Sequence, residues 1–352
     1  MHMSERPQIT ALIDTYNHER FIAEAIESVL AQDFPASEME ILVVDDGSTD
    51  STPEIVRRYA ERVRYIRKEN GGQASALNLG FAEARGEIVA MLDGDDVWLP
   101  SKISRVAAEF AKEPDAVVVC HPYITWLCDQ NVEIEDQTFH PVRGKMPLGQ
   151  EDLLRYGDYG TCGMALRREA ASPLFPLPEG LKIYADTYIV FLAIFVGKVV
   201  GIKECLTKYR YHSSNLAAFR ESDAVKEKRR WASYVKATEE ARKWLDGHNY
   251  DAGRPDLAAY LKRHNLVTQM LRFYWDPPGR AEYFRYLRDS QKLYAPLWTL
   301  RYRAFRTLLS LAGFALGYHG LAHLQESYRR SRAPLRLRRG LFPAHGAEAS
   351  LL

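Results

Sequence analysis

The chain has 352 residues, of which 46% are hydrophobic and 26% are charged, and this composition excludes an intrinsically disordered protein. Its formal net charge of +1 argues against a general affinity of the whole molecule for nucleic acid. The length allows one large α/β domain with an appended segment.

The first third of the chain alternates apolar runs with stretches that repeat apolar residues at helical spacing. Strands are predicted at residues 9–13, 40–44, 63–66 and 88–92, and helices at residues 21–30, from Pro53 onward and up to Ala84. The run at 88–92 is apolar throughout, which is typical of a strand buried on both faces of a parallel sheet. The alternation predicts a doubly wound sheet with right-handed crossovers. No Gly-x-Gly-x-x-Gly follows the first strand, so the dinucleotide fingerprint is missing.

Polar and acidic residues follow three of these strands. They are Asp14 and Asn17 after the first, Asp45 and Asp46 after the second, and Asp93, Asp95 and Asp96 after the fourth. Any one such cluster is typical of a turn or a solvated strand end, but the carboxyl ends of parallel strands share one edge, where open α/β sheets bind ligands. Packed carboxylates need a cation to offset their repulsion, and hard oxygen ligands suit magnesium or manganese. Together with Tyr16, which could stack on a base, the clusters predict a nucleoside diphosphate site.

Several motifs in this region resemble those of family 2 glycosyltransferases with a GT-A fold. The matching stretches are Thr15-Tyr16-Asn17, Val43 to Asp50, Asn70-Gly71-Gly72-Gln73 with Asn78, and Leu92 to Trp98. The resemblance covers residues 9–110 and implies a GT-A doubly wound mixed sheet with a helical C-terminal extension. It also implies that Tyr16 and Asp46 contact the nucleobase of a nucleotide-sugar donor and that Asp95 binds Mn2+ or Mg2+.

The resemblance implies further donor-binding residues. They are Asp14, Thr15, Asn17, Gly72, Gln73, Asn78 and Asp93, with Arg210 from the second half of the domain. Two of them depart from the family pattern. Asp14 stands where the family usually has Pro, Cys or Ser, which bears on base recognition. Gln73 stands where many members carry Lys or Arg, which bears on the diphosphate contact.

Asp186 is the predicted catalytic base. Family members commonly carry Glu-Asp at this place, and this chain keeps the Asp but has Ala185 instead of the Glu. The acceptor hydroxyl must lose its proton as it attacks the anomeric carbon, and a carboxylate within hydrogen-bond reach accepts that proton. The alternative is that Asp186 is only the N-cap of the apolar helix predicted at residues 189–196.

The rest of the second half shows a weaker pattern. Strands are predicted at residues 116–120, 161–169 and 206–211, and residues 121–149 are expected to form an irregular acceptor loop. The last strand leads into His212, in a Tyr-Arg-x-His-x-x-Asn pattern that resembles the end of the family's catalytic domain. His212 is predicted as a metal ligand beside Asp95, with a satisfied structural histidine as the alternative.

Beyond residue 218 the pattern becomes helical, with helices predicted at 224–245, 255–274 and 278–293. The predicted organisation is a GT-A domain at 1–218, with a nucleotide-binding half at 1–110 and an acceptor half at 111–218, then a helical extension at 219–295 and a basic amphipathic tail at 296–352. Residues 296–342 carry nine arginines against one acidic residue, Glu326. Such a segment suits an interfacial helix on anionic lipid, with a dimerising helix pair or nucleic-acid binding as alternatives.

The termini and the cysteines bear on location. Residues 1–7 lack the apolar core of a signal peptide, and no stretch reaches the roughly 20 apolar residues of a membrane span. The four cysteines show no metal-ligand spacing and predict reduced thiols. We therefore expect a cytoplasmic protein, with peripheral contact to the inner face of the cell membrane through residues 296–342.

The predicted function is an inverting, metal-dependent glycosyltransferase. It moves a sugar, from a UDP-sugar by preference, to an acceptor hydroxyl of a glycan, polysaccharide or lipid-linked glycan. A sugar nucleotidyltransferase is one alternative, and it would need a Gly-rich basic loop where this chain has Asp14-Thr15-Tyr16-Asn17. A non-catalytic sugar-nucleotide-binding module is the other, and the loss of the Glu at Ala185 fits it. No nucleic-acid partner is expected, and a homo-oligomer is left open.

Overall fold

The computed structural model describes residues 7–136, 139–157, 159–212, 215, 224–250 and 253–330. Its strands are β1 (Ile9–Thr15), β2 (Met39–Asp45), β3 (Arg64–Arg67), β4 (Ile88–Asp93), β5 (Val97–Trp98), β6 (Ala116–Cys120), β7 (Ile124–Leu127), β8 (Val132–Glu135), β9 (Arg143–Gly144), β10 (Met164–Arg167), β11 (Lys198–Gly201) and β12 (Thr207–Tyr211). Its α-helices are α1 (Ile22–Leu30), α2 (Thr52–Arg57), α3 (Gln73–Glu83), α4 (Lys102–Lys112), α5 (Gln150–Arg155), α6 (Arg168–Ala171), α7 (Ala185–Val196), α8 (Ala224–Gly247), α9 (Pro255–Phe273), α10 (Arg280–Tyr294) and α11 (Leu300–Arg330).

The chain divides into two compact units. Unit 1 takes the described residues of 1–146, 157–220 and 236–244, and unit 2 takes those of 147–156, 221–235 and 245–352. The predicted domain boundary at residue 218 lies outside the described residues. Residues 236–244 of α8 belong to unit 1, so the compact unit draws on chain well beyond that boundary.

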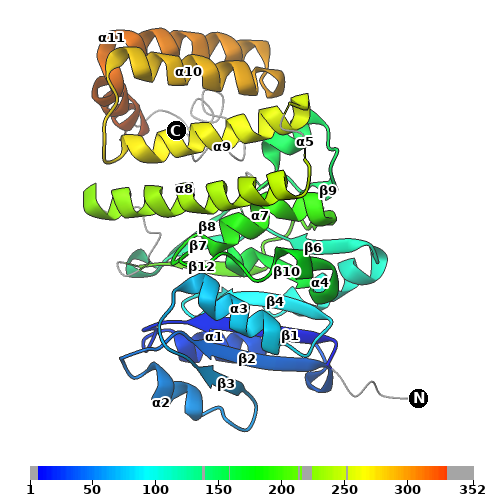
Figure 1. The fold of residues 1–352 in the computed structure, drawn as a ribbon. Helices are drawn as coiled ribbons and strands as arrows, with labels where there is room; N and C mark the ends of the chain where they lie inside the picture. The colour runs from blue at the N-terminus through cyan, green and yellow to red at the C-terminus, as the bar shows by residue number, and fades with distance from the viewer. Residues whose placement is uncertain are drawn as a thin grey trace. The chain divides into compact units, whose positions relative to one another are not determined.

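Unit 1 is built on an eight-stranded mixed sheet in the order β3-β2-β1-β4-β10-β6-β11-β9 (Figure 1). Strands β3, β2, β1 and β4 are parallel to one another, and β10 is antiparallel to both of its neighbours. This confirms the predicted α/β class with a mixed sheet. Every residue of β1 is buried, as expected for a strand covered on both faces. Helix α3 packs so closely on β1 that a Cβ at Gly80 would lie 2.3 Å from Leu12 Cδ1.

The stretch expected to be an irregular loop, residues 121–149, contains three strands, so that expectation is wrong. β7 and β8 belong to a second sheet with the order β5-β12-β7-β8, and β9 closes one edge of the first sheet. All four residues of β8 are exposed, so this strand lacks the alternation that sequence patterns reveal. The strand predicted at 161–169 is also shorter than expected, because residues 161–163 form a 3-10 turn and α6 begins at Arg168.

Unit 2 is helical. Helices α9, α10 and α11 follow the predicted pattern, and aromatic rings of α9 and α10 pack edge to face around Phe273, with Tyr283 at 6.1 Å and Tyr286 at 5.2 Å. Helix α11 is interrupted at Gly317, whose φ of 73° is not helical. Within the described part of the chain, no helix combines the length and apolar character that a membrane span requires. The predicted basic tail beyond residue 330 lies outside the described residues.

Candidate functional site

The candidate site begins where β1 and β4 end side by side in the sheet. The register pairs Asp14 of β1 with Asp93 of β4, and on the other side of β1 it pairs Thr15 with Asp45 of β2. Partner residues of neighbouring parallel strands point to the same face of the sheet. The fold therefore brings Asp14 and Asp93 together, although they are far apart in the sequence.

Asp14 and Asp93 are buried close to other carboxylates, and too little positive charge from the described part of the chain lies nearby to balance them. Burial and then the charge of Asp95 raise the pKa of Asp14 to about 8. Burial and then the charge of Asp14 raise the pKa of Asp93 well above its usual value, and Asp186 adds to both effects. Asp14 Oδ1 is buried and has no hydrogen-bond partner among the described residues. A cation or a proton would offset this repulsion.

Asp95 is in a different environment from its neighbours. Its Oδ2 lies 3.1 Å from His212 Nε2, 3.1 Å from Asn215 Nδ2 and 3.8 Å from His18 Nε2. Burial acts to raise the pKa of Asp95, but His18 and His212 outweigh it and hold the pKa below its usual value. The structure thus brings together the two predicted metal ligands, Asp95 and His212. The sequence analysis missed His18, whose only signal was its place one residue after Asn17.

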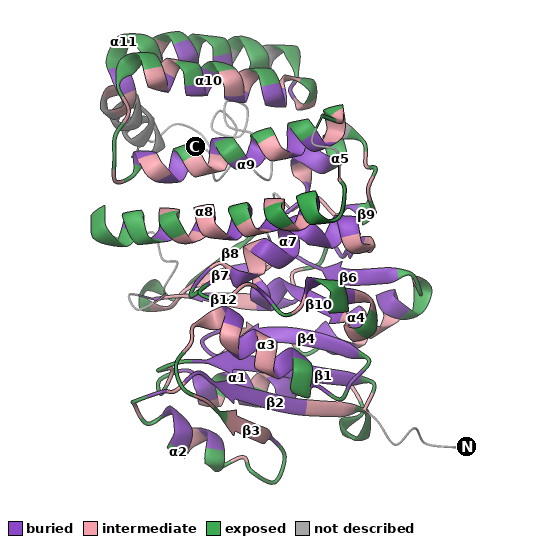
Figure 2. Cartoon of the chain, in the orientation of Figure 1, coloured by how far each residue is buried: buried purple, intermediate pink, exposed green. Residues whose placement is uncertain are grey.

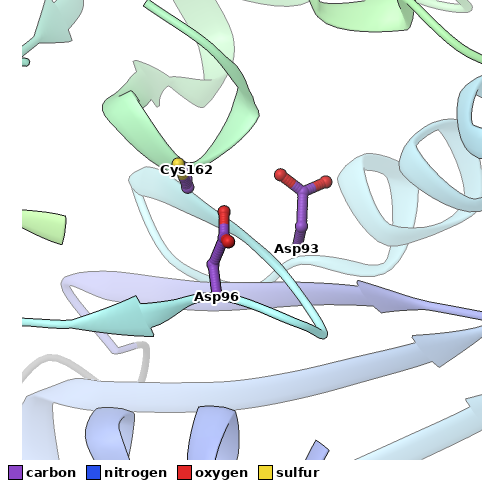
Figure 3. Close-up of side chains that lie close together, drawn as sticks. All are labelled: Asp93, Asp96 and Cys162. Carbon is purple, nitrogen blue, oxygen red and sulfur yellow. The ribbon is translucent and has the colours of Figure 1, made fainter. Parts of the chain in front are cut away.

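Asp93, Asp96 and Cys162 form a second group, in which one ligand atom of each lies within 4.8 Å of the others (Figure 3). Burial and then the negative charge of Asp96 and Asp93 raise the pKa of the Cys162 thiol well above its usual value. The thiol therefore stays protonated, and Mg2+ and Mn2+ prefer oxygen ligands. We therefore exclude Cys162 as a metal ligand and assign the three side chains to the buried interior of the site.

Lys102, at the start of α4, is completely buried beneath these carboxylates. Its Nζ donates to the carbonyl oxygen of Cys162 at 2.6 Å and lies 4.3 Å from the centre of the Trp98 ring. Burial lowers the pKa of Lys102 to about 7. The sequence analysis did not single out this lysine, because a lysine at the start of an amphipathic helix is ordinarily exposed.

Asp46, predicted to bind the nucleobase, organises the loop before α3. Its carboxylate accepts hydrogen bonds from the backbone N–H of Gly71 at 2.9 Å and of Gly72 at 2.7 Å, and from Lys68 Nζ at 2.9 Å. Gly72 has a φ of 88°, and a Cβ there would lie 2.7 Å from Lys182 Cα. Only glycine fits this position without strain.

The turn after β1 presents the predicted stacking residue, Tyr16, which is 40% exposed. Asn17 holds this turn in a left-handed conformation with a φ of 56°. Its backbone N–H donates to Ser48 Oγ at 2.9 Å, and its side-chain oxygen accepts from the N–H of Thr49 at 2.8 Å. Thr15 Oγ1 lies 3.1 Å from His18 Nδ1, which orients the imidazole toward Asp95. An exposed aromatic ring on a fixed turn is suited to stacking on a base.

Gln73 lies between the two halves of unit 1. Its Nε2 donates to Asp93 Oδ1 at 3.2 Å and to Thr161 Oγ1 at 3.1 Å, and its Oε1 accepts from the backbone N–H of Ala185 at 3.3 Å. One neutral amide therefore connects a strand-end carboxylate to the N-terminus of α7.

Asp186 is the second residue of α7, and the N-cap is Tyr184, with a φ of 63°. The alternative that Asp186 is the N-cap is therefore wrong. Its Oδ1 accepts the backbone N–H of Thr187 at 2.7 Å, and burial raises its pKa. Asp186 is close enough to the strand ends for its charge to act on both Asp14 and Asp93.

The side chains of two residues predicted to bind the nucleotide-sugar donor form hydrogen bonds within the protein instead. The Arg210 guanidinium donates to the carbonyl oxygen of Asp95 at 2.7 Å and to Glu24 Oε2 at 2.5 Å. Asn78 binds the backbone of Leu177 at both ends of its amide, donating to the carbonyl at 3.0 Å and accepting from the N–H at 2.6 Å. The donor-binding roles of Arg210 and Asn78 stay predictions, and this geometry lends them no support.

The donor set fits a divalent cation. Asp93 and Asp95 are hard oxygen ligands, His212 Nε2 lies beside Asp95, and the buried Asp14 oxygen has no partner within the described residues. Carboxylates so crowded favour an ion that supplies two positive charges, and Mn2+ accepts imidazole as well as oxygen.

Comparison with known proteins gives a family match that contains the strand-end carboxylates of this site and ends before Asp186 and His212. Residues 10–175 match the sequence family described as glycosyl transferase family 2. An uncharacterized glycosyltransferase of Nostoc sp. is 38% identical over 221 residues, which cover 59% of this chain and 66% of that protein. An uncharacterized glycosyltransferase of Rickettsia prowazekii is 27% identical over 274 residues, which cover 74% of this chain and 82% of that protein. The chain thus spans slightly less than two thirds of the Nostoc relative.

Solved structures with a similar fold include S. aureus TarS 1–349 in complex with UDP-GlcNAc, with a TM-score of 0.54, 18% identity and coverage of 92% of each chain. A mannosyltransferase from Pyrobaculum calidifontis in complex with GDP-Man and Mn2+ also has a TM-score of 0.54 and 18% identity, covering 99% of this chain and 87% of that one. At this identity the likeness shows the fold alone.

Proposed function

We propose that the chain, whose residues 10–175 match glycosyl transferase family 2 and whose fold is GT-A-like, is an inverting, metal-dependent transferase of sugars from a nucleoside diphosphate. The convergence of Asp14, Asp93, Asp95 and Asp186 on one edge of the sheet carries the proposal. Burial raises the pKa of Asp14, Asp93 and Asp186, whereas two imidazoles lower that of Asp95. Carboxylates with such different environments suit different roles.

The reaction is a single displacement at the anomeric carbon. The acceptor hydroxyl oxygen forms the new bond to that carbon, while the bond from the carbon to the donor's diphosphate oxygen breaks with its electron pair. The hydroxyl proton passes to the carboxylate of Asp186, and the nucleoside diphosphate leaves. Attack from the side opposite the leaving group inverts the anomeric configuration.

The remaining residues hold the donor. Tyr16 stacks on the base, and the loop that Asp46 organises through Gly71 and Gly72 lines the base site. Asp95, with His212 beside it, would hold a divalent cation, and Asp93 orients the donor sugar. When bound, a divalent cation stabilises the charge that develops on the leaving diphosphate.

The names of the similar structures support a nucleotide-sugar donor. TarS was solved with UDP-GlcNAc and the mannosyltransferase with GDP-Man and Mn2+, so both bases are compatible with this fold. We propose a UDP-sugar as donor, and a glycan, polysaccharide or lipid-linked glycan as acceptor. A panel of UDP-, GDP- and dTDP-sugars, assayed for hydrolysis with and without manganese, tests the donor and the metal together. Release of pyrophosphate from a nucleoside triphosphate would instead favour a nucleotidyltransferase.

Replacement of the proposed base is the most direct test. We expect Asp186→Asn to lower kcat by about 10²–10⁴-fold, because the hydroxyl proton loses its acceptor. Burial raises the pKa of Asp186, so the wild-type kcat should fall as the pH drops through that raised pKa and the carboxylate becomes protonated. The variant should lose this acidic limb of the pH profile.

An exposed aspartate, Asp33, provides the matched control, and Asp33→Asn should retain full activity. Undiminished transfer by folded Asp186→Asn protein would rule out the assignment of the base. Donor binding by the wild type without turnover on any acceptor would favour the non-catalytic alternative.

A further inference from the structure

Helix α11 buries polar side chains and exposes a row of apolar ones, which is the opposite of an ordinary amphipathic helix. Its buried face contains Tyr302, Arg306 and Ser310, which are 5%, 4% and 6% exposed. Among the described residues, its opposite side exposes a row of apolar side chains flanked by the exposed Arg303 and Thr307, and we call this row the α11 apolar stripe. The stripe consists of Leu300, Ala304, Leu308, Leu311 and Ala315. These positions recur every three or four residues, so they lie on one side of the helix. Figure 2 shows exposed residues, in green, along α11.

The exposure of this stripe is large. Leu300 is 82% exposed, Leu308 66% and Leu311 56%. On the flank of the stripe, Phe314 is 53% exposed and contacts Phe284 of α10 edge to face at 5.2 Å. Single exposed apolar residues are common on protein surfaces, but a contiguous helical row marks a contact surface.

One contact with α10 and one with Trp298, which precedes α11, hold the helix in this orientation. Gln291 Nε2 of α10 donates to Thr307 Oγ1 at 2.6 Å, and the Arg306 guanidinium lies 5.1 Å from the centre of the Trp298 ring. Ser310 Oγ donates to the carbonyl oxygen of Arg306 within the helix at 2.9 Å. Arg306 and Ser310 are thus buried, whereas Leu300, Leu308 and Leu311 are exposed.

The net charge of the sequence segment that contains the stripe selects its partner. Residues 296–342 carry nine arginines against Glu326 alone. A second copy of the chain would bring this excess of positive charge against itself, which costs repulsion. An anionic lipid surface attracts the same charge, while its acyl boundary accepts the leucines.

We propose that α11 lies on an anionic membrane surface, with its apolar stripe inserted at the boundary between headgroups and acyl chains, and that the basic charge of residues 296–342 is attracted to the headgroups. The helix does not cross the bilayer. This inference is independent of the sugar transfer reaction, because it depends on residues of unit 2 alone.

Flotation of the full chain with vesicles tests this proposal. Vesicles of phosphatidylcholine with added phosphatidylglycerol should carry the protein upward, and vesicles of phosphatidylcholine alone should carry much less of it. Salt should weaken the binding, because it screens the arginine charge. The triple variant Leu300→Gln/Leu308→Gln/Leu311→Gln should reduce partitioning by at least about tenfold, since it removes most of the inserted apolar surface.

Two exposed apolar residues outside α11 give matched controls, namely Val225, 76% exposed, and Ile134, 53% exposed. Val225→Gln and Ile134→Gln should float like the wild type. Donor hydrolysis by the triple variant should equal that of the wild type, which shows that it is folded and separates this test from the test of the transfer reaction.

Three results would overturn the proposal. A full chain that does not float excludes membrane binding, and equal flotation of the triple variant excludes the stripe as the contact. A dimer in light scattering that the triple variant abolishes, without any effect of vesicles, would identify a second copy as the partner.

Discussion

At the scale of single residues, Gln73 connects the strand-end carboxylate Asp93 with the first residue of α7. Its amide contacts Asp93, which is proposed to orient the donor, and the backbone at Ala185, directly before the proposed base. A lysine or arginine here would neutralise Asp93 directly, whereas the neutral glutamine leaves the strand-end carboxylates for a cation. The departure from the family pattern thus has a structural role in this chain.

We expect Gln73→Leu to lower kcat by about tenfold with a smaller change in the donor KM. The substitution keeps the size of the side chain but removes the hydrogen bonds that position Asp93 and the start of α7, and each such bond is worth about 0.5–1.5 kcal/mol. Steady-state kinetics with varied donor measure both constants. The exposed residue Gln8 gives the control Gln8→Leu, which should be silent. A rise in KM at constant kcat would instead assign Gln73 to donor binding.

At the scale of elements, α3 is attached to the chain before α7 by backbone contacts that sequence periodicity does not reveal. The N–H of Gln73 and of Ala74 donate to the carbonyl oxygens of Lys182 and Leu181, at 3.3 and 3.1 Å. These bonds satisfy N–H groups that a helix N-terminus leaves without internal partners. The same contacts bring the start of α3, and with it Gln73, close to Asp186.

Asn78 also connects α3 with this region. Its substitution distinguishes a structural role from the predicted donor-binding role. We expect Asn78→Ala to lower the free energy of unfolding by about 1–3 kcal/mol, because the backbone N–H and carbonyl of Leu177 both lose their partner. Denaturant unfolding measures this loss, and the donor KM of the folded variant should be unchanged. A large rise in KM without loss of stability would restore the donor-binding prediction.

At the scale of the whole molecule, unit 1 is not a continuous segment. It includes residues 236–244 of α8, and Trp244 Nε1 donates to the carbonyl oxygen of Pro173 at 3.2 Å within this unit. Burial and then the charge of Glu240 raise the pKa of Tyr188 to about 12. Unit 1 is therefore expected to need this stretch of α8 for its stability.

We expect a fragment of residues 1–218 to melt at least about 4 °C below a fragment of residues 1–247, because it lacks the contacts of residues 236–244. Thermal unfolding followed by circular dichroism measures the difference. A fragment of residues 1–235 is the control, since it keeps the first half of α8 but not the contacting stretch, and it should resemble 1–218. Equal melting of 1–218 and 1–247 would support the predicted boundary.

The sequence by itself determined the order of the elements in the first half and the residues at the strand ends. Apolar runs and helical periodicity are local properties, so β1, β2, β4, α1 and α3 could be predicted from them. The convergence of Asp14, Asp93 and Asp95 followed from the rule that parallel strands end at one edge. The short strands β7, β8 and β9 could not be predicted, because too few residues carry any pattern.

Only the tertiary structure decided which side chains meet. His18 reaches Asp95, and Lys102 lies buried beneath Cys162, through contacts between segments that sequence spacing does not relate. Asp46 uses its carboxylate to hold the loop at Gly71 and Gly72, a contact fixed by the register of β2 beside its neighbours. The same holds for α11, where periodicity indicated an amphipathic helix but packing against α10 decided that its apolar side faces outward. Local patterns specify elements, whereas contacts depend on how register, crossovers and packing bring distant residues together.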